Sequence, residues 1–341
     1  MPAAPVWRRL EDVPASLGPT AVTIGNFDGV HRGHARVLAQ LAHEASERGL
    51  APVALTFWPH PRHVCVEPGS PVLVTDRGDR DELLGAQDLA GVLDLEFTWD
   101  FAQHSPEDFV RIFLVEGLGM RCIVMGADSL FGKDNAGDIT TMRELGRAHG
   151  FEVVLVDEFG CDEAGPDRSR ISSSGIRAAL ERGDVADAAR MLGRPHRVTD
   201  VVHHGFKRGR ELGFPTANLG PHPDGLVPGD GVYAGYLTVV HQAPGHEGTP
   251  PLVRAPATIS IGTNPTFATE GEPAPRMVEA YVHGSHDHDL YGDTVRLEFV
   301  ERQRPTLCFG SAEELVEQME RDKAVTVRTL ADQGLGAHDA P

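Results

Sequence analysis

The sequence predicts an α/β domain, with a parallel sheet and helices on both faces, followed by a small antiparallel β-barrel that ends in a helix. Its 341 residues suffice for two domains of about 150 residues each. In the first half, short apolar runs rich in β-branched residues alternate with segments of helical periodicity. In the second half, β-type segments follow one another without an intervening helical pattern, and Gly, Pro, Asn and Asp fill their joints.

The first half carries five strand-like runs with helical patterns between them. We expect strands at 20–24, 52–58, 91–95, 122–125 and 152–156, and helices at 35–48, 105–116 and 138–149. The second of these helices has a clear start, because Ser105 can cap it and Pro106 suits its first position. In an open parallel sheet the carboxyl ends of the strands form the ligand-binding edge. The loops that follow the strands are therefore the candidate site.

The second half carries the segments of the predicted barrel. We expect strands at 196–204, 232–241, 257–261, 276–283 and 294–301. The closing helix begins with a capping box at Ser311, and its apolar face is expected to comprise Leu315, Met319, Val325 and Leu330. A helix that ends at Gly193, before Pro195, indicates the domain boundary. The expected limits are 1–186 for the first domain, 187–196 for a linker, 197–333 for the second domain and 334–341 for a disordered tail.

Composition and charge exclude several classes of partner. The chain has 31 basic and 50 acidic residues, a net charge of −19, which disfavours binding to a nucleic-acid backbone. No apolar run approaches the ~20 residues of a membrane span, and residues 1–10 lack a signal-peptide segment, so a cytoplasmic protein without a membrane partner is expected. Four scattered cysteines without a C-x-x-C pair argue against a disulfide framework or a zinc site. We expect small anionic ligands, and a monomer or weak homo-oligomer.

The stretch 24–34 lies between the first predicted strand and the first helix. It combines a glycine-punctuated turn with His31 and His34, three residues apart on the first helical turn. Backbone N–H groups in such a turn, together with the partial positive charge of a helix N-terminus, favour a phosphate. The stretch matches neither of the common glycine-rich phosphate motifs and is instead an H-x-G-H pattern. Zinc binding by the two histidines is the less favoured alternative, since no third ligand is apparent.

Three further loops of the first half carry chemically useful residues. A Pro-His-Pro corner at 59–61 follows the second strand, and a glycine-bounded loop at 126–133 follows the fourth. Three serines at 172–174 begin a helix, with Arg177 one turn further on, and offer hydroxyl and N–H groups to an anion. Taken alone, the serines are more typical of a helix cap. Their occurrence with the H-x-G-H turn favours a phosphate site.

A second candidate site begins the barrel half. The stretch 205–218 is dense in glycine and cations and ends in Pro-Thr-Ala-Asn. Its backbone amides and the side chains of Lys207, Arg208 and Arg210 suit a polyphosphate. Thr216 and Asn218, two apart on a strand edge, can share one Mg²⁺, a cation that takes oxygen ligands. The alternative is a basic turn on a solvated face.

The motifs together resemble a known family. They are I-G-N-F-D-G-V-H-R-G-H (24–34), T-F-W-P-H-P (56–61), G-x-D-x-x-F-G (126–132), I-S-S-S-x-I-R (171–177), L-G-R-P (192–195), G-x-x-R-G-R-x-L-G-F-P-T-A-N (205–218), I-G-T-N-P-T-F (261–267), V-E-A-Y (278–281) and L-Y-G (290–292). In this order and spacing they are similar to the bacterial bifunctional riboflavin kinase/FMN adenylyltransferases, also called FAD synthetases. The resemblance covers the chain from about Trp7 to Leu330.

For the barrel half, the resemblance implies a riboflavin kinase that forms FMN from riboflavin and ATP. It assigns Glu279 as the general base and Thr216 and Asn218 as Mg²⁺ ligands. The remaining ATP- and flavin-binding residues that it implies are Gly205, Lys207, Arg208, Gly209, Arg210, Gly213, Pro215 and Arg304.

For the first half, the resemblance implies a Rossmann-like nucleotidylyltransferase domain that joins FMN to the AMP part of ATP, giving FAD and pyrophosphate. His31, His34 and Arg177 match its catalytic residues. Its phosphate-binding residues match Gly25, Phe27, Asp28, Gly33, Ser172, Ser173 and Ser174. Gly33, which has no Cβ, is expected to let the triphosphate approach the helix. The flavin side is expected to involve His60, Pro61, Asp128 and Phe131.

One loop departs from the family pattern. Ser129 and Leu130 stand where the family usually has an aromatic and then a polar or basic residue. The loss of that ring would open the flavin side of the pocket, and Trp58 is a candidate substitute. Two alternatives therefore stay open: a paralogue with only kinase activity or an altered flavin preference, and a non-catalytic flavin carrier. Intact Thr216, Asn218 and Glu279 argue against the carrier.

Overall fold

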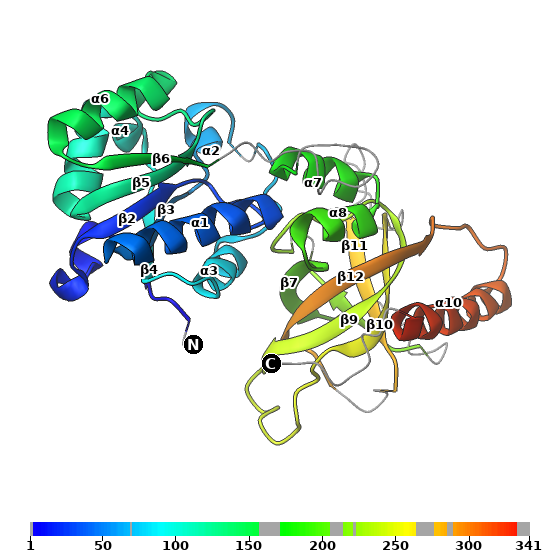
Figure 1. The fold of residues 1–341 in the computed structure, drawn as a ribbon. Coiled ribbons are helices and arrows are strands. Elements are labelled where there is room, and N and C mark those ends of the chain that lie inside the picture. The colour runs from blue at the N-terminus through cyan, green and yellow to red at the C-terminus, as the bar shows by residue number, and fades with distance from the viewer. Residues whose placement is uncertain are drawn as a thin grey trace. The chain divides into compact units, whose positions relative to one another are not determined.

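The chain divides into two compact units, Met1–Ser173 and Ser174–Pro341, each coloured along the chain in Figure 1. The computed structural model describes residues 3–68, 70–156, 171–204, 214–220, 223–263, 276–284 and 289–332. Each unit is built around one sheet. The first sheet is open and the second is closed into a barrel.

The first unit contains a six-stranded sheet in the order β1-β4-β3-β2-β5-β6, with every neighbouring pair parallel. Its strands are β1 (Val6–Trp7), β2 (Thr20–Ile24), β3 (Ala51–Trp58), β4 (Gly91–Glu96), β5 (Met120–Gly126) and β6 (Glu152–Val156). The five predicted strands are confirmed. The edge strand β1 was not predicted, because two residues are too short to establish a periodicity.

Helices cover both faces of this sheet, as expected (Figure 1). On β2, Ala21 packs into the cluster that holds Leu41 of α1 (Arg32–Arg48), while Val22 faces the opposite cluster. Leu84 of α3 (Arg77–Gly85) packs on the α1 side. The opposite face is covered by α5 (Pro106–Phe109), the π-helical segment Val110–Gly117 and α6 (Ile139–His149). Alternate strand residues thus bury into two layers, which explains the nearly unbroken apolar runs.

The first unit also contains short helices in the segments between its strands and long helices. They are 3₁₀ turns at Leu10–Asp12, Ala15–Leu17 and Lys133–Asn135, with α2 (Pro61–Cys65) and α4 (Trp99–Ala102). The helices α2 and α4 follow the carboxyl ends of β3 and β4, and they contact one another.

The sheet has one topological switch point, between β2 and β5. From β2 the chain passes through α1 to β3 on one side, whereas β5 pairs with β2 on the other side. The loops at the carboxyl ends of β2 and β5 therefore leave in opposite directions. In open α/β sheets this divergence opens the ligand crevice.

The second unit contains a closed barrel in the order β10-β11-β8-β7-β12-β9. Its strands are β7 (His196–His203), β8 (Thr216–Leu219), β9 (Gly231–His241), β10 (Ala255–Thr263), β11 (Arg276–Val282) and β12 (Thr294–Arg304), and the paired neighbours are antiparallel. The predicted antiparallel barrel is confirmed. Side chains such as Ile259, Ala280 and Leu219 fill its interior.

The boundary between the two units lies earlier in the chain than the end that we expected for the first domain. Helices α7 (Ser173–Glu181) and α8 (Val185–Leu192) group with the barrel beyond residue 173, whereas we expected the first domain to continue to residue 186. The physical reason is packing: α8 lies on β7 and β12, and the Gly229 N–H donates to the Leu180 carbonyl at 2.8 Å. The expected linker, 187–196, is mostly helix α8. As limits of functional domains, 1–186 and 197–333 stay predictions, and 334–341 lie outside the described residues.

The closing helix α10 (Ala312–Asp332) docks on the barrel through a largely polar face. Its buried residues are Asp322, Thr326 and Leu330, whereas Val325 is 37% exposed, so the expected apolar face is wrong at that position. The guanidinium of Arg304 holds the Asp322 carboxylate through Nε–Oδ1 at 2.9 Å and Nη2–Oδ2 at 2.6 Å. Polar partners on the barrel thus select the helix face that becomes buried.

None of the helices in the described ranges combines the length and apolarity that crossing a bilayer would require.

The Arg304–Asp322 pair should stabilise the second unit. Asp322→Ala leaves the mostly buried Arg304 guanidinium without its carboxylate and should lower the free energy of unfolding by about 3 kcal/mol. Urea denaturation measures this change. Glu317→Ala, which breaks the exposed Arg321–Glu317 pair on the same helix, is the matched control and should cost less than about 1 kcal/mol. Equal effects of the two changes would contradict a docking role for Asp322.

Candidate active sites

The turn between β2 and α1 has an unusual backbone. Phe27 (φ 50°), Gly29 (φ 84°) and Val30 (φ 37°) all lie in the left-handed region. For a β-branched residue such as Val30, this conformation is strained and persists only where the surroundings enforce it. Such turns concentrate at functional sites. This one stands at the switch point of the sheet.

The carboxylate of Asp28 holds the turn in place. Its Oδ1 accepts the N–H groups of Val74 (2.8 Å) and Thr75 (3.2 Å), and the Gly29 N–H donates to Thr75 Oγ1 at 3.1 Å. Asp28 is nearly fully buried. Its side chain therefore fastens the turn to the segment before α3, a role that its assignment as a phosphate-binding residue did not include.

The two histidines stand together where α1 begins. His31 is the N-cap, and its Nδ1 accepts the backbone N–H of His34 at 3.2 Å. The rings are stacked, with centroids 3.6 Å apart and planes 14° from parallel. The sequence predicted that the pair faces one way, and the structure confirms this. His31 lies at the cap rather than within the first turn.

The hydrogen bonds indicate which nitrogen of each ring is a donor. Nδ1 of His31 is an acceptor, so in the neutral ring the proton is on Nε2. Nδ1 of His34 is buried without a partner in the described part of the chain, an environment that suits the unprotonated nitrogen better than an N–H. Burial and the neighbouring His31 hold the pKa of His34 well below its ordinary 6.5. Both rings can therefore present Nε2–H groups while uncharged.

Gly33 is needed beside His31. A Cβ at this position would lie 2.9 Å from Cε1 and Nδ1 of the His31 ring. The reason we gave for this glycine, close approach of a triphosphate, is therefore incomplete, because the space is occupied by the stacked histidine. The ring of Phe27 packs nearby, edge-on to His34 with centroids 5.3 Å apart, and against Gly25.

The predicted serine cluster is divided between the two units. Ser173 belongs to the first, and its hydroxyl donates to the Asp28 carbonyl at 2.8 Å, which joins the cluster to the strained turn. Ser172 precedes it in the same unit. Ser174 and Arg177 belong to the second unit, where Arg177 Nη2 donates to Ser174 Oγ at 3.3 Å.

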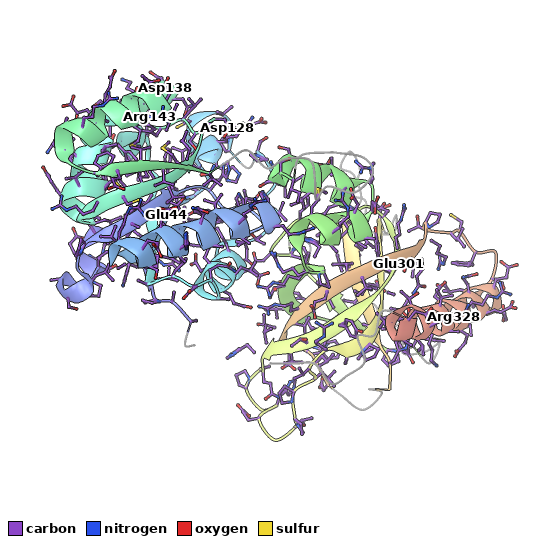
Figure 2. The ribbon with its side chains drawn as sticks, viewed as in Figure 1. Glu44, Asp128, Asp138, Arg143, Glu301 and Arg328 are labelled. Carbon is purple, nitrogen blue, oxygen red and sulfur yellow. The ribbon has the colours of Figure 1, made fainter. Side chains whose placement is uncertain are left out.

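The residues expected on the flavin side have different environments. His60 is the N-cap of α2, with Nδ1 accepting the Arg62 N–H at 3.2 Å, and Pro61 is the first residue of that helix. Asp128 is exposed beyond the carboxyl end of β5, where Figure 2 labels it. Phe131 is buried in the core and packs on Phe109, so its ring contributes to the fold.

One charged cluster of the first unit was not predicted. Asp94, fully buried on β4, is an acceptor for the guanidinium groups of Arg8, Arg77 and Arg80. The Arg77 and Arg80 guanidiniums also lie 5.9 Å and 5.7 Å from the centroid of the Trp58 ring. Asp94, a single acid inside an apolar strand run, was the only sign of this cluster in the sequence. The three arginines lie 86, 17 and 14 residues from it, so no local pattern links them to it.

The second site lies on the outer face of the barrel. Register places Asn218 on β8 directly opposite Glu279 on β11, and Thr216 opposite Tyr281. The alternate residues Ala217 and Ala280 fill the interior, so Thr216, Asn218 and Glu279 share the outward face. Directly opposed residues have Cβ atoms about 5 Å apart. Three of the predicted kinase residues are thus brought together.

The polar groups on this face have distinct partners. The Asn218 amide nitrogen donates to the Thr216 carbonyl at 3.1 Å and hydroxyl at 3.3 Å, which turns its oxygen away from them. Glu279 is partly buried, and burial raises the pKa of its carboxyl above the ordinary 4.5. A carboxylate whose pKa is raised binds a proton more strongly and is a suitable proton acceptor.

The other predicted kinase residues either lie outside the described residues or contact other parts of the barrel. Gly205, Lys207, Arg208, Gly209, Arg210 and Gly213 lie outside the described residues. Pro215 precedes β8, next to Phe214, whose ring packs on Tyr281 at 5.1 Å. The fork of Arg304 is bound to Asp322, so the structure shows it holding α10.

Comparison with known proteins assigns each half to a family of enzymes. Residues 13–174 match the family model of FAD synthetase, and residues 192–330 match that of riboflavin kinase. A bifunctional riboflavin kinase/FMN adenylyltransferase of Bacillus subtilis is 34% identical over 320 residues, which is 92% of this chain and 93% of the relative. The chain belongs to this family.

Two further similarities extend over nearly the whole chain. The Escherichia coli K12 riboflavin kinase/FMN adenylyltransferase is 31% identical over 302 residues, covering 89% of this chain and 90% of its own. A solved Streptococcus pneumoniae structure, described as a macrolide-efflux protein, superposes with a TM-score of 0.80 at 26% identity and covers 95% of this chain and 98% of its own. The order of the two family domains matches the order of the two units.

Zinc binding by the histidine pair gains no support. Within the described ranges, no three His, Cys, Asp or Glu side chains gather as a metal-binding group. The two rings are instead stacked, and the pKa of His34 is lowered by burial, an arrangement suited to hydrogen bonding.

The close fit of Gly33 beside His31 is testable. Gly33→Ala should push the His31 ring out of its stack, because the new Cβ would lie 2.9 Å from two ring atoms. We expect at least a tenfold loss of FAD formation, with FMN formation unchanged, measured by chromatography of the flavins. Ala35→Gly, on the same helical turn, is the control for helix stability. Wild-type FAD formation by Gly33→Ala would mean that the stacked geometry is dispensable.

Proposed function

We propose that the residues brought together in each unit carry one of the two activities of the family. The barrel transfers the γ-phosphoryl group of ATP to riboflavin, giving FMN and ADP. The first unit transfers AMP from ATP to FMN, giving FAD and pyrophosphate. The observation that carries the assignment is the shared outer face of Thr216, Asn218 and Glu279, together with the stacked histidines at the switch point.

In the barrel, Glu279 is assigned as the general base. Its carboxylate would accept the proton of the ribityl hydroxyl as that oxygen attacks the γ-phosphorus and ADP leaves. Partial burial supports this role, because a desolvated carboxylate holds a proton more strongly than an exposed one. Phosphoryl transfer otherwise requires mainly the positioning of groups and the neutralisation of charge.

The same face fits Mg²⁺. Thr216 supplies a hydroxyl oxygen and Asn218 an amide oxygen turned away from its hydrogen-bond partners, both hard ligands of the kind that Mg²⁺ takes. When bound, the ion would offset the charge of the ATP phosphates. Thr216 and Asn218 would hold it, and Glu279 on the adjacent strand stays available for the proton.

In the first unit, the FMN phosphate is itself the nucleophile, so the protein needs no nucleophilic side chain. A phosphate oxygen attacks the α-phosphorus of ATP, and the bond to pyrophosphate breaks. His31 and His34 would donate Nε2–H hydrogen bonds to the phosphate oxygens, where charge develops. Ser172, Ser173, Ser174 and Arg177 are proposed to hold the remaining phosphates.

The kinase-only alternative is less favoured. A first unit that had lost its activity would have no need of a strained turn, a stacked histidine pair and a glycine fitted to it. The departure at Ser129 and Leu130 remains the feature that could alter the flavin preference. We place His60, Pro61 and Asp128 on the flavin side.

The proposed reactions also indicate the ligands and partners of the protein. Its ligands would be ATP, riboflavin and FMN, and the net charge of −19 disfavours a nucleic-acid partner. We propose a cytoplasmic protein that is a monomer or a weak homo-oligomer.

Incubation of the purified chain with riboflavin, Mg²⁺ and ATP, followed by separation of the flavins, tests the proposal. FMN and then FAD should appear in sequence. Accumulation of FMN without FAD would favour the kinase-only alternative, and the absence of both products would reject the enzymatic assignment.

Two substitutions should separate the activities. His31→Ala should abolish FAD formation from FMN and spare FMN formation from riboflavin, because it removes a phosphate donor of the first unit alone. Glu279→Ala should do the reverse, since adenylylation of supplied FMN does not need the barrel carboxylate. Each variant is the control for the other. Loss of both activities from either change would contradict independent sites.

The riboflavin kinase reaction should depend on the ionisation of Glu279. Because burial raises its pKa above 4.5, the rate should fall as the pH drops through a value higher than that of an ordinary glutamate. The measurement is kcat for FMN formation between pH 4.5 and 8, with circular dichroism to confirm that the chain stays folded. The Glu279→Gln variant should lose this acid limb together with most of its rate. An identical limb in that variant would assign the titration to another group.

A further inference from the structure

The three arginines around Asp94 use their guanidinium groups differently. Arg80 donates through Nη2 to Asp94 at 2.7 Å and through Nη1 to the Phe57 carbonyl at 2.8 Å. Arg8 contacts Asp94 with one terminal nitrogen and Asp81 with the other, the latter at 2.6 Å. Arg77 bonds Asp94 only through Nε, at 2.6 Å. Within the described ranges, its two terminal nitrogens have no hydrogen-bond or ion-pair partner.

Arg77 is also held in a defined orientation. Its Nε is fixed by a fully buried carboxylate, and its guanidinium lies 5.9 Å from the centroid of the Trp58 ring. The side chain is 34% exposed, so the terminal nitrogens can meet a ligand. An arginine fixed at Nε presents its remaining donors with little further loss of conformational entropy.

The position of Arg77 connects it to the first active site. It is the first residue of α3, directly after the N-cap Asp76. The preceding Val74 and Thr75 are the residues that bind Asp28 and Gly29 of the strained turn. Trp58 ends β3 at the carboxyl edge of the sheet, next to the Pro-His-Pro corner. Arg77 therefore belongs to the same edge as the stacked histidines.

The charge of the cluster favours an anion. Three guanidinium groups face two carboxylates, Asp94 and Asp81, which leaves one positive charge in excess within a chain whose net charge is −19. A phosphate group is the natural partner of a partly exposed arginine whose two terminal nitrogens have no partner among the described residues.

We propose that Arg77 is an additional substrate-binding residue of the first unit, which holds a phosphate group of FMN or of ATP through its terminal nitrogens. This inference rests on the proposed adenylyltransferase function. Asp94 and Trp58 act through Arg77 and are positioning residues.

Steady-state kinetics of FAD formation by the full chain test the proposal. Arg77→Ala should raise KM for one phosphate-bearing substrate about tenfold, the usual order for losing a charge-assisted hydrogen bond, with kcat less affected. A rise confined to FMN assigns the flavin phosphate, and a rise confined to ATP assigns the nucleotide phosphates. Arg77→Lys keeps the positive charge but loses the forked guanidinium group. Its KM should therefore lie between those of the wild type and Arg77→Ala.

Arg8→Ala is the matched control. It also removes one partner of Asp94, but both terminal nitrogens of Arg8 are already engaged by carboxylates, so no free donor is lost. Its KM values should stay within about twofold of the wild type. Unfolding in urea reports how much each change weakens the fold.

Substrate binding without turnover gives an independent readout. Titration calorimetry of FMN and of a non-hydrolysable ATP analogue should show weaker binding of the same ligand by Arg77→Ala. Unchanged KM values and affinities, or equal effects of Arg77→Ala and Arg8→Ala, would overturn the inference and leave Arg77 as a fold-stabilising ion pair. If the wild type forms no FAD, the proposed function fails first, and the calorimetric arm still tests Arg77.

Discussion

The hydrogen bonds from Val74 and Thr75 to the buried Asp28 carboxylate are the constraint on which the first active site depends. Phe27 and Val30 occupy backbone conformations that cost energy, and these contacts help to hold them there. The Ser173 hydroxyl is bonded to the carbonyl of the same aspartate, and α3 begins two residues after the contact. The carboxylate of Asp28 thus fixes the turn that precedes the histidines to the segment that leads into Arg77, and the backbone carbonyl of Asp28 holds Ser173.

In the barrel, the direction of the strand side chains determines where the candidate site lies. A closed six-stranded barrel fills its interior with side chains, here Ile259, Ala280 and Leu219 among others, so a substrate site has to lie on its outside. Strict alternation along β8 and β11 then sends Thr216, Asn218 and Glu279 outward together. The helix α10 covers another part of the outer surface through Asp322 and Thr326, bound to partners on the barrel.

Apolar patterns made much of the fold predictable, whereas polar contacts between distant segments did not. Apart from β1 and β8, the strands of both sheets follow from β-branched runs, and the motif loops fall at strand ends where ligands bind. Periodicity wrongly placed Val325 on the buried face of α10, because Asp322 and Thr326 have buried partners that no local pattern reveals. The same limit concealed the Asp94 cluster, the engagement of Arg304, and the packing of His31 beside Gly33.

In both candidate sites, burial shifts the pKa of the group to which we assign a chemical role. Desolvation lowers the pKa of His34 and raises that of Glu279, so each group is shifted toward its neutral form. In the mechanism that we propose, a neutral His34 would donate a hydrogen bond without carrying a fixed positive charge that would bind pyrophosphate tightly after the reaction. For the glutamate, a raised pKa makes it a stronger base toward an alcohol. On this proposal, the same physical effect would serve product release in one unit and proton transfer in the other.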